Sequence, residues 1–268
     1  MITKVMGTKK EVILFPGGNT VIIGDRINPV INSRVQNALQ AANMQTLVDE
    51  ARSQFTAGAD MILINVCGNG INEEKLLPES ILAVTAEIGA PVVVDTKNPT
   101  ALKTALDVCP GKPVVASING TDHSLNELLP LAMDRKAAIL VSGLNDRGAP
   151  DAVEERIELG RNTLRQVLSQ GMPREDIILA VPAGSIKNNP KEALAVITTL
   201  SKLSRIEMIN CCVSIGELSS GLQESVDLDH AFIALCISSG ANCLVADPKQ
   251  YADCIKATDV LLCRNSLA

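Results

Sequence analysis

Residues 91–98, with the sequence PVVVDTKN, decide the fold. Three valines follow the proline without polar alternation, which is typical of a strand buried on both faces of a sheet. Asp95 stands where this strand ends and a polar loop begins, and Pro99 suits the first turn of a following helix. Sites in parallel α/β proteins form at the carboxyl ends of strands. Asp95 is therefore either a site carboxylate or a cap of the following helix.

Outward from this stretch, apolar runs, polar loops and helical patterns alternate along the chain. We expect strands at 21–24, 61–65, 92–95, 113–117, 138–142, 177–180, 207–214 and 243–246. We expect helices at 31–57, 76–88, 99–108, 125–133, 151–169, 191–203, 227–239 and 248–263. This alternation implies a parallel sheet with right-handed crossovers. Eight such units in 268 residues match the size of a (β/α)8 TIM barrel.

The alternative to the barrel is a doubly wound open sheet. The first strand is not followed by a glycine-rich dinucleotide fingerprint, which disfavours that alternative. Before the first repeat, residues 1–20 form a short preamble. A strand at 11–15, a turn at 16–19 and the next strand at 21–23 indicate a β-hairpin that plugs one end of the barrel. We therefore predict an α/β fold with one domain, 1–268.

The composition limits the class of protein. Hydrophobic residues make up 46% of the chain but aromatic residues only 1%, which suits a barrel interior of branched aliphatic side chains. The net charge of −6 argues against a nucleic-acid partner. The eight cysteines form no CxxC pair and lie mostly in apolar segments, so we expect buried free thiols in a reducing cytoplasm. We expect no signal peptide and no membrane span.

Polar side chains follow the predicted strands and should converge on one mouth of the barrel. They are Asp25, Arg26, Asn28, Asn65, Asp95, Ser117, Asn119, Asn145, Ser214 and Asp247. Histidine and cysteine do not cluster among them, so we expect no metal site. His230 falls within a helix and is predicted to be structural, whereas His123 lies in a strand-end loop that can contact a ligand. This set favours hydrogen bonding to a flat polar heterocycle over covalent catalysis.

Four groups of residues give the chain a family resemblance. They are IIGDRIN at 22–28, GAD at 58–60 with INV at 64–66, VDTKN at 94–98 and GMPREDI at 171–177. In order and spacing they resemble the pterin-binding methyltransferases, which comprise methyltetrahydrofolate:corrinoid protein methyltransferases and the folate domain of cobalamin-dependent methionine synthase. Dihydropteroate synthase is a more distant relative. The resemblance covers nearly the whole chain after Val21.

The resemblance implies a dihydropteroate synthase-like barrel that usually forms a homodimer. Tetrahydrofolate or methyltetrahydrofolate would bind at the mouth, and a separate corrinoid-binding protein would bring the cobalamin. Asp95 matches the family aspartate that pairs with the pterin amino and ring N–H groups, and a carboxylate can accept two such parallel hydrogen bonds. The expected pterin-binding residues are Asp95, Asn65, Ser117, Asn119, Asn28 and Asp247. Asn119 and Ser214 are the expected catalytic residues.

The chain departs from the family pattern at three positions. Ser117 stands at the family asparagine after the fourth strand, with Asn119 two residues later. The second pterin aspartate, after the sixth strand, falls at Ala180. The asparagine after the seventh strand, which contacts the pterin N5 atom, falls near Ser214, and Ile215 is its direct counterpart. Isoleucine cannot donate a hydrogen bond to N5 as a leaving group.

These departures favour methyl transfer from a corrinoid protein to tetrahydrofolate, the second methyltransferase step of a corrinoid-dependent demethylase system. Two alternatives remain open. A dihydropteroate synthase-like condensing enzyme would need an anion site near the last strands, where the sequence offers Lys249 and the unplaced Arg264. A degenerate pterin-binding subunit without catalysis would fit Ala180 and Ile215.

Overall fold

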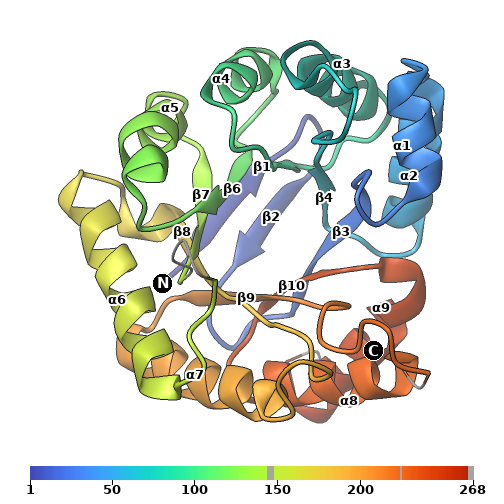
Figure 1. The fold of residues 1–268 in the computed structure, drawn as a ribbon. Coiled ribbons are helices and arrows are strands. Elements are labelled where there is room, and N and C mark those ends of the chain that lie inside the picture. Colours follow the sequence, from blue (N-terminus) through green and yellow to red (C-terminus); the bar gives the residue numbers. More distant parts are fainter. Residues whose placement is uncertain (144–147, 224, 265–268) are drawn as a thin grey trace.

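A closed barrel of parallel strands forms the centre of the molecule. The computed structural model describes residues 1–143, 148–223 and 225–264 (Figure 1). Among these residues, eight strands close in the order β10-β3-β4-β5-β6-β7-β8-β9. Their bounds are β3 Val21–Ile27, β4 Met61–Ile64, β5 Val92–Val94, β6 Val114–Ile118, β7 Ala138–Ser142, β8 Ile177–Val181, β9 Asn210–Ser214 and β10 Cys243–Ala246. The predicted TIM barrel is confirmed.

The helices form a ring outside the barrel (Figure 1). Their bounds are α1 Ser33–Gln40, α2 Met44–Thr56, α3 Glu73–Glu87, α4 Pro99–Val108, α5 Leu129–Asp134, α6 Val153–Ser169, α7 Glu192–Glu207, α8 Ser225–Ser238 and α9 Pro248–Leu261. A π-helical turn, Ser124–Leu128, precedes α5, and a 3-10 turn, Arg174–Asp176, precedes β8.

The prediction of one helix over 31–57 is wrong. Asn32 caps α1 by accepting the Val35 N–H, and the helix ends at Gln40. Ala42 then adopts a left-handed backbone with φ of 51°, which ends the helical path before α2 begins at Met44. The apolar pattern continues through this break because both helices turn an apolar face to the barrel.

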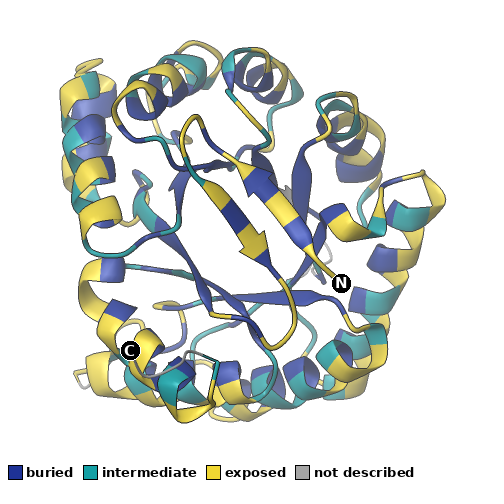
Figure 2. Cartoon of the chain, turned by 180° about the vertical axis from the view of Figure 1, so that it is seen from behind, coloured by how far each residue is buried: buried dark blue, intermediate teal, exposed yellow. Residues whose placement is uncertain are grey.

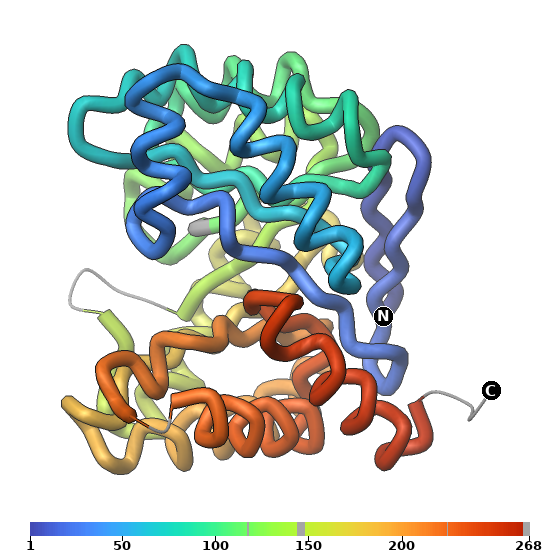
Figure 3. Tube along the Cα trace, turned by 90° about the vertical axis from the view of Figure 1, so that its right-hand side faces the viewer, coloured from blue at the N-terminus to red at the C-terminus, as the bar shows by residue number. Residues whose placement is uncertain are grey.

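A two-stranded antiparallel hairpin closes the amino-terminal end of the barrel. It consists of β1 (Thr3–Met6) and β2 (Glu11–Leu14), which cross that opening in Figure 2. Figure 3 shows the hairpin at the end opposite the loops that follow the strands. The predicted hairpin is confirmed, but its turn is not at 16–19: residues 7–10 connect its strands, and 21–23 belong to the barrel. The carboxyl end is thereby left as the open mouth.

Two hydrophobic layers hold the barrel. One fills its interior with branched side chains such as Ile23, Val93 and Ile178, and the hairpin residue Leu14 packs against it. The other lies between the strands and the helices. Along each strand the side chains alternate between the two layers, as a pleated strand requires. At the carboxyl end of the interior layer, Ala180 is only partly buried, so the packed core ends there and the open mouth begins.

The cysteines are all free, as predicted. Burial is confirmed for Cys109, Cys211, Cys212, Cys236 and Cys243. It is wrong for Cys67 and Cys263, which are exposed. In the described ranges, no helix combines the length and apolar character that a membrane crossing needs.

Candidate functional site

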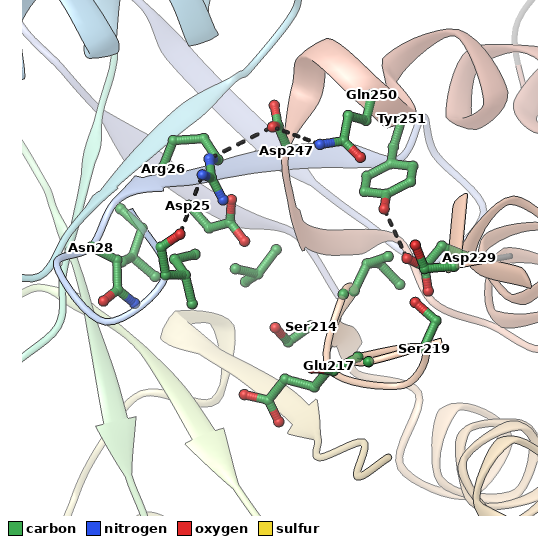
Figure 4. Close-up of a pocket in the computed structure, with 18 of the residues that line it drawn as sticks. Asp25, Arg26, Asn28, Ser214, Glu217, Ser219, Asp229, Asp247, Gln250 and Tyr251 are labelled. Carbon is green, nitrogen blue, oxygen red and sulfur yellow. Dashed lines mark hydrogen bonds and ion pairs between the residues drawn. The ribbon is translucent and has the colours of Figure 1, made fainter. Parts of the chain in front are cut away.

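Two adjoining cavities open at the carboxyl end of the barrel. The first, here called the acidic lobe, has a volume of about 460 Å³ and lies over the ends of β3, β9 and β10 (Figure 4). The second, the apolar lobe, has a volume of about 310 Å³ and lies over β4–β10. The residues that line both are Leu63, Asp95, Ser214, Glu217 and Val245. The lobes are therefore two parts of one mouth.

The apolar lobe has the character of a site for a flat ring. Aliphatic side chains such as Leu63, Leu140 and Val245 form much of its wall, and Ala180 leaves space beside them. Its polar groups come from strand ends and the loops that follow them, including Lys97, Asn119 and those shared with the acidic lobe. A mostly apolar cavity of this size with a few polar groups is typical of small-ligand sites.

Asp95 lies between the two lobes, one residue after β5. The Asn65 side chain donates a hydrogen bond to its Oδ2 at 2.9 Å, and Asn65 is itself held by the Cys67 N–H at 2.8 Å. Asp95 does not cap the following helix. Asn98 caps α4 by accepting the N–H groups of Thr100 and Ala101. Asp95 is therefore directed to the mouth, and the capping interpretation is wrong.

The acidic lobe contains carboxylates that lack full hydrogen bonding within the described residues. Burial, with a smaller effect from Asp247, raises the pKa of Asp25 to about 6 against the lowering effect of Arg26. One Asp25 oxygen is buried without a hydrogen-bond partner. Asp229 is 1% exposed, and one oxygen accepts the Tyr251 hydroxyl at 2.8 Å while the other has no partner. Buried carboxyl groups with unsatisfied oxygens in a cavity make the acidic lobe a candidate functional site.

Asp25→Asn should stabilise the folded protein at neutral pH. Because the pKa of Asp25 is raised from 3.8 to about 6 on folding, the free energy of unfolding falls as the pH rises through this range. Removing the charge should raise the free energy of unfolding by about 1–3 kcal/mol at neutral pH and by little near pH 4. Urea unfolding at both pH values measures this effect. Equal destabilisation at both would show that the Asp25 charge is not strained.

The remaining predicted residues divide between the lobes. Asn28 and Asp247 line the acidic lobe, where the Asn28 side chain accepts the Val30 N–H and Asp247 caps α9, 3.6 Å from the Arg26 guanidinium. Asn119 lines the apolar lobe, and its Oδ1 accepts both the N–H and the hydroxyl of Thr121. Ser214 lines both lobes.

Other predicted residues do not reach these lobes or fall outside the description. Asn65 lines a neighbouring cavity together with Asp95. Ser117 lies in β6, but its side chain is outside the described part of the structure, as is Asn145. His123 is exposed and contacts the Lys97 carbonyl at 2.8 Å, which raises its pKa. No group of three or more His, Cys, Asp or Glu in the described residues is arranged to hold a metal ion.

Sequence reasoning missed Glu217, Asp229 and Tyr251. Glu217 follows Gly216, whose φ of 100° turns the chain sharply after β9 and brings the glutamate to both lobes. Ile215, predicted to face N5, is 4% exposed and packs into the layer between barrel and helices, although it also contributes to the wall of the acidic lobe. The polar turn GELSSG at 216–221 was the available signal.

The fold is a TIM barrel whose mouth, at the carboxyl ends of the strands, contains an apolar and an acidic lobe. A family model described as pterin binding enzyme matches residues 24–245, so the chain belongs to this family. The predicted resemblance to the pterin-binding methyltransferases is confirmed.

Individual relatives agree with this assignment. The methylcorrinoid:tetrahydrofolate methyltransferase of Eubacterium limosum is 24% identical over 249 residues, covering 90% of this chain and 91% of the relative. The methionine synthase of Mycobacterium leprae is 21% identical over 83% of this chain, which spans only 20% of that relative. A structure of Yersinia pestis DHPS with a pterine-sulfa conjugate superimposes with a TM-score of 0.72 at 12% identity, covering 97% of this chain and 99% of that one. That likeness shows the fold.

Proposed function

We propose that this protein is a methyltransferase that moves a methyl group from a corrinoid carried by a partner protein to tetrahydrofolate bound in the mouth. The observation that carries the proposal is the position of Asp95, which is held by Asn65 where the apolar lobe meets the acidic lobe. The near full-length similarity to the Eubacterium limosum enzyme supports the reaction class. The role in a demethylase system rests on the expected direction of transfer.

In this proposal the apolar lobe receives the pterin. Asp95 accepts hydrogen bonds from the pterin amino and ring N–H groups, and Leu63 and Val245 contact the ring faces. Asn119 and Ser214 offer further hydrogen bonds to the ring, and Asn28 and Asp247 extend the polar wall on the other side. The excess of carboxylates in the acidic lobe would repel the acidic tail of a folate, so the tail leaves the mouth elsewhere.

The chain contributes orientation more than covalent chemistry. The corrinoid, bound to its partner, supplies the methyl group as an electrophile at the open end of the barrel. The barrel fixes the pterin so that its N5 lone pair points outward to that group, and such positioning accounts for a large part of catalysis in reactions of two bound partners. A homodimer and a cytoplasmic location remain predictions.

The positions of Arg264 and Lys249 do not support the dihydropteroate synthase-like alternative. Arg264 lies at the amino-terminal end of the barrel, where it donates hydrogen bonds to the carbonyls of Ile237 and Ala241. Lys249 lies 3.9 Å from Glu50. Neither is placed as an anion site in the lobes described above.

Methyl transfer can be followed directly. The protein is mixed with tetrahydrofolate and either a methylated corrinoid protein or free methylcobalamin, and the corrinoid spectrum and methyltetrahydrofolate formation are recorded together. The proposal expects a spectral change that requires both protein and tetrahydrofolate. Binding of tetrahydrofolate without transfer from a methylated corrinoid protein would instead favour a non-catalytic pterin-binding subunit. Absence of binding would reject the pterin site itself.

A further inference from the structure

Among the described residues, Glu217 is the one carboxylate without a partner that lines both lobes. It lines both lobes together with Asp95 and Ser214, and the turn at Gly216 places it over the mouth (Figure 4). Within the described residues its carboxylate makes no hydrogen bond or ion pair, whereas Asp95 is held by Asn65. A carboxylate in the wall of the mouth that has no structural partner is available to a ligand.

The strands that lead to Asp95 and Glu217 lie on opposite sides of the barrel. Asp95 follows β5 and Glu217 lies three residues after β9, and these two strands are four positions apart in either direction around the closed barrel. A ring that spans the mouth with one edge on Asp95 therefore brings its opposite edge to the turn that carries Glu217.

The covalent structure of a pterin matches this arrangement. Its 2-amino group and its N5 atom are attached to opposite corners of the pyrimidine ring. If Asp95 accepts hydrogen bonds from the amino edge, N5 lies on the side of Glu217. On this basis, and resting on the proposed function, we infer that Glu217 is a catalytic residue that accepts the N5 proton during methyl transfer.

The proposed transfer involves the corrinoid methyl group, the pterin N5 and the Glu217 carboxylate. The N5 lone pair forms the new N–CH3 bond while the cobalt–methyl bond breaks, and its electron pair stays on cobalt. N5 began as a secondary amine, so it now carries a positive charge and one proton. That proton passes to the Glu217 carboxylate, which leaves neutral methyltetrahydrofolate and a neutral glutamic acid that later loses the proton to water. In the reverse direction the same carboxyl protonates N5 as it leaves.

The electrostatic surroundings favour this role. Removal of water by the walls of the mouth raises the pKa of Glu217, which makes its carboxylate a stronger base. The charged groups that line the same two lobes are Asp25, Arg26, Asp95, Lys97, Asp229 and Asp247. Arg26 is engaged by Asp247 at 3.6 Å, so this guanidinium is not free to neutralise Glu217.

Binding calorimetry tests the inference without a corrinoid. The N5 of tetrahydrofolate can donate its hydrogen to the Glu217 carboxylate, but the N5 of methyltetrahydrofolate carries none and can only accept one. Binding of methyltetrahydrofolate should therefore take up more protons than binding of tetrahydrofolate at neutral pH, as measured in buffers of different ionisation enthalpy. Glu217→Gln should abolish this difference while both folates still bind. The control Glu87→Gln makes the same chemical change in an exposed ion pair with Arg52 and should preserve the difference in proton uptake.

Kinetics supply the second measurement. Glu217→Gln should lower kcat for transfer to tetrahydrofolate by about 100-fold or more, with a small change in KM. The wild-type rate should fall as pH falls through the raised pKa of Glu217, and this acid limb should be absent in Glu217→Gln and return in Glu217→Asp. If the wild-type enzyme transfers methyl groups and Glu217→Gln shows the same proton uptake and the same rate, this inference alone is overturned. A wild-type protein that binds no folate or transfers no methyl group would overturn the proposed function and this inference with it.

Discussion

Asp95→Asn should weaken tetrahydrofolate binding by about 5- to 150-fold, which corresponds to about 1–3 kcal/mol. The substitution keeps the size of the side chain but removes its charge and replaces one acceptor oxygen by an NH2 group. That group would face an N–H donor of the pterin or of Asn65, which now donates to Asp95 at 2.9 Å. One buried donor is left without a partner in either case. Isothermal titration with tetrahydrofolate measures the loss.

A matched substitution separates this effect from general damage. Asp107→Asn makes the same chemical change on the surface of α4, where Asp107 pairs with Lys103, and should leave tetrahydrofolate affinity unchanged. Circular dichroism establishes that both variants are folded. Unchanged affinity in a folded Asp95→Asn protein would exclude Asp95 as the pterin anchor.

Local signals in the sequence predicted most of the fold. Strands β7 and β10 and helix α4 have the predicted bounds because each is an apolar run or helical pattern ended by a turn signal. The failures lie where tertiary contacts decide. The left-handed Ala42 divides the helix predicted over 31–57, and the hairpin pairs residues 11–14 with 3–6 because the barrel already uses Val21. Neither choice is visible in local hydrophobic periodicity.

The site was predictable at strand ends and less so in the loops. Asp95 follows a strand directly, so its direction depends only on the strand. Glu217 reaches the mouth through a glycine with positive φ, and such a turn shifts which residue faces the ligand. Asp229 of α8 and Tyr251 of α9 both line the acidic lobe and are joined by a hydrogen bond, and neither helix position follows from the ends of the strands. Residues on loops and helices thus complete a site that the strands begin.

A buried ion pair holds the loops on one side of the apolar lobe. Arg156 of α6 and Glu192 of α7 are 3% and 4% exposed, and two hydrogen bonds of 2.9 and 2.7 Å join them. Glu192 also accepts the Gly184 N–H at 2.7 Å, and Arg156 donates to the carbonyl of Pro150. The pair therefore fixes the segment after β8, which supplies part of the lobe wall.

Glu192→Gln should lower the free energy of unfolding by about 3–5 kcal/mol, because the Arg156 charge would stay buried without its counter-charge. Denaturant unfolding measures the loss. The double variant Arg156→Met with Glu192→Leu should recover much of it, since neither side chain then carries a charge. If the double variant is as unstable as Glu192→Gln, the loss does not come from the unpaired charge of Arg156.

The pH dependence of this loss gives an independent check. Burial alone would raise the pKa of Glu192, but hydrogen bonds from Arg156 and Gly184 outweigh it and hold the pKa below its usual value. A carboxylate with a lowered folded pKa stabilises the protein above its unfolded pKa, and this stabilisation is lost as pH falls through the folded value. The difference between wild type and Glu192→Gln should therefore be full at neutral pH and shrink in acid. A pH-independent difference would mean that the charge of Glu192 contributes nothing to holding the apolar lobe.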